Sequence, residues 1–221
     1  VYYSRKQFKK AKGTEIGENI LLDLFSKNGF TIISPEQLTL DEQIAVVRNT
    51  KLLCGIIGTL GHNMLFAKPE QHMILVNKTH NINVAQMDIN KMKNLDMTYI
   101  DSYLAEFPSL IGNGPFLITY SEKLNQYVER HNWKKPAEDV IRETVLKRNL
   151  QEYEEMYRSR NLKNLRLVYE KNPDRFDYFA PDHLLELEMR FYHLEHPATM
   201  REKIFYQYNR VKRAFRRIVK R

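Results

Sequence analysis

Short apolar runs alternate with segments of helical periodicity over the first 133 residues of the chain. The runs are almost continuously apolar, which is typical of parallel strands that are covered on both faces. Strand and helix patterns that take turns in this way predict an α/β fold with a doubly wound, mostly parallel sheet. The expected strands are Val1–Tyr3, Phe30–Ile33, Leu52–Ile57, Met73–Val76, Thr98–Ile100 and Phe116–Thr119.

Two helices are expected between the first three strands. Apolar residues from Ile16 to Phe25 recur at helical spacing, and Gly29 is placed to end that helix. Thr39 and Glu42 have the three-residue spacing of a capping box, which predicts the start of the second helix.

Three glycines, Gly55, Gly58 and Gly61, interrupt the end of the third expected strand, and a further helix is expected to begin near Thr59. A glycine turn that opens a helix places backbone N–H groups and a positive dipole end where a phosphate can bind. In the alternative interpretation, glycine only permits close packing at a tight turn. The pattern leaves both open. The chain lacks the Lys-Ser/Thr pair of a P-loop at this turn, which argues against an ATPase of that type.

Other polar residues follow the first two strands, where ligands bind in doubly wound sheets. Arg5 emerges after the first strand, and its guanidinium can pair with phosphate or remain solvated. Glu36, Glu42 and Gln43 follow the second strand, at a place for ribose or base contacts, although Glu42 is also explained by the capping box. Asn63 lies in the first turns after the glycines and can bind a ligand or a neighbouring loop.

The chain changes character after Trp133, because residues 136–195 contain no convincing strand. We therefore predict three regions, namely an α/β lobe over 1–133, a helical extension over 134–198 and a C-terminal helix over 199–221. The helices expected in the extension are Ala137–Tyr157, Leu162–Lys171 and Pro181–Leu194.

Residues 199–221 contain nine Lys or Arg and one Glu, so their net charge of +8 equals that of the whole chain. A narrow apolar stripe with basic flanks predicts an amphipathic helix that lies on an anionic membrane surface. The alternatives are a helix packed on the body and, less favoured for want of a recognised motif, a nucleic-acid contact. The expected membrane-surface residues are Arg210, Lys212, Arg213, Arg216 and Arg217.

The remaining chemistry is sparse. Cys54 is the single cysteine and lies in an apolar run, which predicts a buried thiol in a reducing cytoplasm and no disulfide within the chain. No apolar run is long enough to span a membrane, so we expect a cytoplasmic protein that is peripheral at the inner face of the membrane if the tail binds lipid. Neither a metal site, a cofactor nor a catalytic Ser/His/Asp or Cys arrangement is predicted.

Four motifs follow one another at the start of the chain. Tyr2–Arg5 has the pattern Y-x-S-R, Gly29–Leu38 has G-F-x-I-I-x-P-E-x-L, Glu42–Gln43 opens a helix, and Gly55–Phe66 has G-x-x-G-T-x-x-H-N-x-x-F. In this order and spacing they resemble glycosyltransferase family 61, the group that includes bacterial capsular-polysaccharide transferases. The resemblance covers about residues 1–80.

The resemblance implies a GT-B arrangement of two Rossmann-like lobes, in which this chain is the C-terminal lobe that holds a nucleotide-sugar donor. It implies metal-independent transfer of the sugar to a glycan or lipid-linked glycan, in capsular or other cell-surface polysaccharide synthesis. An acceptor lobe is then expected to precede Val1. By the same resemblance, the donor diphosphate would be bound by Arg5, Gly58, Thr59 and Asn63, and the nucleoside would lie near Glu36, Glu42 and Gln43.

Two departures from the family pattern favour an alternative function. Ile57 stands where many members have His, and residues 12–19 read KGTEIGEN where members often carry paired Arg and Asn-Glu. The alternative is a non-catalytic scaffold module of a membrane-associated polysaccharide assembly complex.

Overall fold

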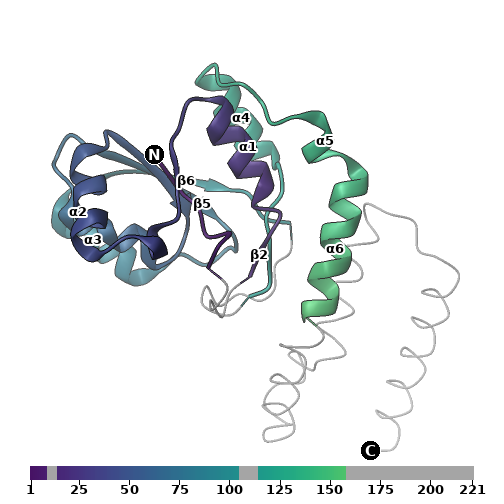
Figure 1. Cartoon of the computed structure of the whole chain (residues 1–221), viewed down its shortest axis with the longest axis horizontal. Coiled ribbons are helices and arrows are strands. Elements are labelled where there is room, and N and C mark those ends of the chain that lie inside the picture. The colour runs from purple at the N-terminus through teal and green to yellow at the C-terminus, as the bar shows by residue number, and fades with distance from the viewer. Residues whose placement is uncertain (9–13, 105–113, 158–221) are drawn as a thin grey trace, which may run out of the picture. The chain divides into compact units, whose positions relative to one another are not determined.

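The computed structural model describes residues 1–8, 14–104 and 114–157, all within one unit that comprises residues 1–157. In this unit a parallel sheet of five strands is flanked by helices, with α1 and α4 on one face and α2 and α3 on the other (Figure 1). The predicted α/β class is therefore confirmed. The helices expected at Leu162–Lys171, Pro181–Leu194 and 199–221 lie outside the described residues, and the boundaries at 133 and 198 stay predictions.

The strands of the main sheet are arranged in the order β3-β1-β4-β5-β6, and all neighbours are parallel. Numbered along the chain, this order is 2-1-3-4-5, so the direction in which strands are added reverses between β1 and β4. Ligands of doubly wound sheets bind at the carboxyl ends of the strands at such a reversal. The strands are β1 Tyr2–Tyr3, β3 Ile32–Ile33, β4 Leu52–Ile56, β5 His72–Asn77 and β6 Asp96–Asp101.

The capping signals correctly predicted the end of the first helix and the start of the second. Gly29 has a φ of 78° and follows the end of α1, which confirms the predicted stop. At the start of α2, Glu42 N–H donates to Thr39 Oγ1 and Thr39 N–H donates to Glu42 Oε2, so the capping box is confirmed. The helices of the unit before residue 131 are α1 Asn19–Lys27, the 3₁₀ helix η1 Pro35–Gln37, α2 Leu40–Asn49, the 3₁₀ helix η2 Thr59–Phe66, α3 Val84–Lys93 and α4 Glu122–Arg130.

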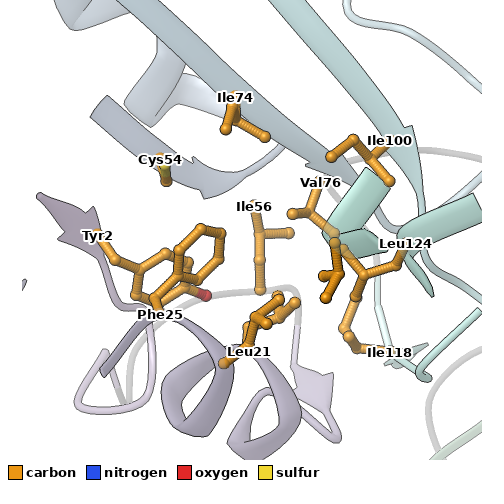
Figure 2. Packing of buried hydrophobic residues seen from close by; sticks show 12 residues of the cluster. Tyr2, Leu21, Phe25, Cys54, Ile56, Ile74, Val76, Ile100, Ile118 and Leu124 are labelled. Atoms are coloured by element: carbon orange, nitrogen blue, oxygen red, sulfur yellow. The ribbon is translucent and has the colours of Figure 1, made fainter. Parts of the chain in front are cut away.

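Each face of the sheet carries its own hydrophobic core. Tyr2 stacks on Phe25 of α1 with ring centroids 4.6 Å apart, and Cys54 and Ile56 of β4 lie in the same cluster (Figure 2). On the other face, Tyr3 packs with a second cluster that includes Leu53, Ile57, Met64 and Leu75. Burial on both faces explains why β4 reads as a continuous apolar run, and it confirms the predicted buried thiol.

A second, two-stranded sheet was not predicted. Its strands β2 Glu15–Ile16 and β7 Phe116–Leu117 are parallel to each other and lie outside the main sheet. Ile16 therefore belongs to a strand, not to the first helix, and the expected strand Phe116–Thr119 does not extend the main sheet. Gly17, directly after β2, permits the backbone of Ile118 to lie close, since a methyl group built on Gly17 would lie 2.2 Å from Ile118 O.

The single helix predicted over Ala137–Tyr157 is two helices, α5 Glu138–Ile141 and α6 Glu143–Tyr157. They are separated at Arg142, whose ψ of 148° is extended. Val140 and Ile141 are β-branched and have low helix propensity, which is consistent with a break here. α5 contacts α1, and α6 contacts β2 and β7. Among the residues that the structure describes, no helix combines the length and apolar character needed to cross a membrane.

Candidate functional site

The carboxyl ends of β1 and β4 bring Arg5 and Gly58 together. Gly58 is buried at the N-cap of η2, and a methyl group built on it would lie 3.6 Å from Arg5 Nη1. Thr59 is the first residue of η2 and is exposed, so glycine, not threonine, occupies the capping position. The guanidinium of Arg5 thus lies beside the start of η2, at the reversal in strand order.

The close-packing explanation of the glycines holds at one position of the turn. A methyl group on Gly61 would lie 2.3 Å from Oε1 of the buried Gln86, which requires a side chain to move. A methyl group on Gly55 would make only ordinary contact with Tyr3 O, at 3.6 Å. For a methyl group built on Gly58, Nη1 of Arg5 is the one atom within 4 Å among the described residues, apart from the two neighbours in the chain. Packing therefore accounts for Gly61, whereas Gly58 faces a cationic side chain.

Gln43 and Asn63 are also brought together. Asn63 Nδ2 donates to Gln43 Oε1 at 3.1 Å, which joins η2 to α2. Gln43 Nε2 donates to Pro35 O at 3.0 Å and to Leu38 O at 3.2 Å, which adds the loop around η1. The Gln43 amide is therefore engaged in holding the segments that surround the reversal.

Glu36 of η1 and Glu42 of α2 are both exposed. The hydrogen bonds from the backbone N–H and hydroxyl of Thr39 lower the pKa of Glu42, so its carboxylate is ionised at neutral pH. No contact joins either carboxylate to Arg5 in the described residues. One further link holds the loops, because Gln37 Nε2 donates to Gln7 Oε1 and so connects η1 to the segment after β1.

Sequence reasoning missed a buried ionic cluster behind Arg5. Lys78 Nζ lies 2.6 Å from Glu15 Oε1, and Arg5 Nε lies 3.2 Å from the same oxygen. The Lys78 side chain is 2% exposed and that of Glu15 is 4% exposed. A signal was present for Lys78, since it follows β5 directly and Arg5 follows β1 after one residue.

Glu18 is a second buried carboxylate of this cluster. Its Oε1 accepts hydrogen bonds from Arg5 N–H at 2.8 Å and from Tyr2 Oη at 3.1 Å. Burial raises the pKa of Glu18 above its ordinary value, and the hydrogen bonds to its carboxylate offset only part of that rise. Glu18 thus fixes the backbone of Arg5, while Glu15 contacts its side chain.

Within the described ranges no group of three His, Cys, Asp or Glu side chains is placed to hold a metal ion. The polar groups at the reversal suit an anionic ligand, because a guanidinium and the start of a helix both attract phosphate or carboxylate. Residues 1–74 match the model of the glycosyltransferase 61 family. This match supports a relation to glycosyltransferases, which in general use a nucleotide-sugar donor and a glycan acceptor. No curated protein and no solved structure matches the chain.

The match to glycosyltransferase family 61 runs from β1 to the first part of β5. It therefore contains the reversal between β1 and β4 and the cluster residues Glu15 and Glu18, whereas Lys78 lies beyond it. All the residues predicted to bind the donor are inside the matched range, namely Arg5, Glu36, Glu42, Gln43, Gly58, Thr59 and Asn63.

Proposed function

We propose that this chain binds the nucleotide-sugar donor of a family 61 glycosyltransferase that transfers a sugar to a glycan or lipid-linked glycan. The observation that carries the proposal is the family match over residues 1–74, which spans the reversal at which Arg5 lies beside Gly58. We place the reaction in capsular or other cell-surface polysaccharide synthesis, with this chain as the donor lobe of a GT-B enzyme.

The donor diphosphate would bind between Arg5 and the first residues of η2. The Nη groups of Arg5 can donate two parallel hydrogen bonds to phosphate oxygens, and backbone N–H groups at the start of η2 can donate to others. As the bond between the sugar and the diphosphate breaks, negative charge grows on the leaving oxygen. Preorganised donors stabilise that charge, so direct displacement by the acceptor needs no metal ion in this proposal.

The nucleoside would lie beside η1 and α2. Exposed carboxylates such as Glu36 and Glu42 can accept hydrogen bonds from ribose hydroxyls or base N–H groups. Gln43 and Asn63 are bonded to each other, so their role would be to shape the loop under the nucleotide.

Calorimetric titration of the full chain with uridine and guanosine diphosphates tests the proposal. We expect one of them to bind, and Arg5→Ala to weaken binding about tenfold or more, because a hydrogen-bonded charge pair with phosphate is lost. Lys6→Ala is the matched control, since Lys6 is an exposed cation one residue away that donates to Asn19. The proposal fails if neither nucleotide binds, or if the two variants lose affinity equally.

A second candidate function is a non-catalytic scaffold in a membrane-associated polysaccharide assembly. Ile57 favours it, because this residue directly after β4 is fully buried in apolar surroundings and offers no polar group to a ligand. The two functions differ in turnover. Release of free sugar or transfer from a bound donor supports the transferase, whereas nucleotide binding without turnover supports the scaffold.

We also propose that residues 199–221, which lie outside the described residues, attach the protein to the cytoplasmic face of an anionic membrane. Basic residues near such a surface contribute about 1 kcal/mol each before salt screening. Flotation with vesicles that contain anionic lipid tests this directly. The proposal predicts loss of flotation when residues 199–221 are deleted, and unchanged flotation after deletion contradicts it.

A further inference from the structure

Two cations share a single carboxylate oxygen next to the reversal. Glu15 Oε1 is 2.6 Å from Lys78 Nζ and 3.2 Å from Arg5 Nε. These residues come from three separate segments, since Glu15 is in β2 while Arg5 and Lys78 follow β1 and β5. The shared oxygen therefore connects the second sheet to the carboxyl edge of the main sheet.

Lys78 is firmly held in this cluster. Its side chain is 2% exposed, and its ammonium lies 4.3 Å from the centre of the Phe116 ring. Phe116 is the register partner of Glu15 in the second sheet, so both contacts of the ammonium come from the same pair of strands. Burial lowers the pKa of Lys78, and Glu15 opposes that shift by favouring the charged form. A buried cation requires such a partner, because an unpaired charge in the interior is strongly destabilising.

Arg5 is held differently, because the Phe8 ring lies 5.7 Å from its Cζ and its Nη1 points to the Gly58 turn. Glu18 accepts the backbone N–H, and Glu15 lies against Nε. Nη1 lies at the Gly58 turn, where a ligand that binds the start of η2 would meet it. The Arg5 side chain is 14% exposed, far more than the two residues behind it. The cluster thus has a buried end at Lys78 and an accessible end at Arg5.

We propose that Lys78 and Glu15 are positioning residues for an anionic diphosphate. Lys78 anchors the Glu15 carboxylate, and Glu15 orients the Arg5 guanidinium so that its Nη groups meet the ligand at Gly58. Neither Lys78 nor Glu15 touches the diphosphate, and both act through Arg5. This inference rests on the proposed function and adds to it two residues, of which Lys78 lies outside the family match.

The experiment is a double-mutant cycle on the full chain, with affinity for uridine and guanosine diphosphates, the two nucleosides and inorganic pyrophosphate measured by calorimetry. We expect Lys78→Met and Glu15→Gln each to weaken diphosphate binding about fivefold to tenfold and to leave nucleoside binding unchanged. In an Arg5→Ala background, neither change should weaken binding further by more than about twofold, because coupled residues are not additive.

Glu15→Gln separates positioning from simple electrostatics. This variant makes the cluster more positive, so attraction through space alone predicts tighter binding of the diphosphate. Positioning predicts weaker binding, because Arg5 loses the charge that orients it. Tighter binding in Glu15→Gln, or losses that add fully to that of Arg5→Ala, would overturn the inference. Lys51→Met is the control, since it removes the charge of an exposed lysine at the amino end of β4.

Two further outcomes keep the inference apart from the proposed function. If pyrophosphate binds with the expected dependence on Lys78, Glu15 and Arg5 but no nucleotide binds, the positioning cluster stands and the donor proposal fails. If the wild-type chain binds neither pyrophosphate nor a nucleotide, the positioning role and the donor proposal are both overturned. Thermal unfolding of each variant shows whether it is folded. Should Lys78→Met not fold, Glu15→Gln decides the result by itself, because it keeps the shape and the hydrogen-bonding oxygen of the original side chain.

Discussion

Asn63 of η2 and Gln43 of α2 are joined side chain to side chain, with Nδ2 and Oε1 3.1 Å apart. The Nε2 of the same Gln43 donates to the carbonyls of Pro35 and Leu38. One glutamine therefore connects the loop after β3, the helix α2 and the 3₁₀ helix after β4. These are the segments that surround the reversal in strand order.

Replacing Gln43 should cost far more stability than replacing a glutamine whose hydrogen bond is exposed. Gln43→Ala removes the hydrogen bonds to Pro35 O and Leu38 O and the one from Asn63, although Pro35 O still accepts the N–H of Leu38, so we expect a loss of about 1–3 kcal/mol in the free energy of unfolding. Gln126→Ala is the control, because Gln126 makes an exposed hydrogen bond to Glu122 and should lose less than about 0.5 kcal/mol. Urea denaturation measures both. Equal losses would contradict the role assigned to Gln43.

Two glycines with positive φ should respond differently to alanine. Gly29 has a φ of 78° with nothing within 4 Å of an added methyl group, so Gly29→Ala should cost about 1 kcal/mol from the backbone conformation alone. Gly17 has a φ of 88°, and the added methyl group would lie 2.2 Å from Ile118 O. Gly17→Ala should therefore cost about 3 kcal/mol or more and disturb the pairing of β2 with β7. Similar thermal shifts in the two variants would contradict the observed approach of Gly17 to Ile118.

Glu18 should make stability fall as the pH rises. Its pKa is raised in the folded state above the ordinary value of 4.5, so between these values the folded chain binds more protons than the unfolded chain. The free energy of unfolding then decreases with pH across the window that begins near 4.5 and ends above the raised pKa.

The comparison variant is Glu18→Gln, whose amide oxygen can still accept from Arg5 N–H and Tyr2 Oη. We expect the stability of the wild-type chain relative to this variant to decline from pH 4.5 upward, as measured by urea denaturation at a series of pH values. If the free energy of unfolding of the wild-type chain minus that of the variant is constant or increases with pH, the pKa of Glu18 is not raised in the folded state.

Cys54 should be almost unreactive in the folded protein. Burial raises the pKa of its thiol from 9.0 to about 12, which lowers the thiolate fraction at pH 8 by roughly 1,000-fold. Because Cys54 is the single cysteine, the reaction of a thiol reagent reports on it alone. Modification should be slow in buffer and fast in denaturing urea. Comparable rates in the two solutions would contradict the burial of Cys54.

Local sequence signals were sufficient for the elements whose causes are local. β4 was predictable because Leu53 and Ile57 are buried on one face and Cys54 and Ile56 on the other, which makes the segment apolar throughout. The start of α2 was predictable because the capping box is formed by residues three apart. The α/β class followed from the alternation of such elements.

Contacts between distant segments could not be predicted from these patterns. Ile16 is four residues before Ile20 and therefore reads as part of a helix, yet its strand pairs with residues a hundred positions later. The ion pair of Lys78 with Glu15 joins residues 63 apart, and a buried charge has no local sequence signature that separates it from a surface charge. For the same reason, the candidate site was predicted as single residues along the chain, without the cluster that supports Arg5.

The central claim is that the donor binds at the reversal between β1 and β4. Its most direct test is backbone hydrogen exchange, measured with and without whichever nucleoside diphosphate the chain binds. If the donor binds at the carboxyl ends of β1 and β4, backbone amides of residues 57–63 and 4–8 should gain protection in the presence of the nucleotide. Peptides at the opposite edge, around residues 69–72 and 94–97, should be unchanged and serve as an internal control. Protection confined to that opposite edge, or no change in residues 57–63 at saturating nucleotide, would contradict a donor site at the reversal between β1 and β4.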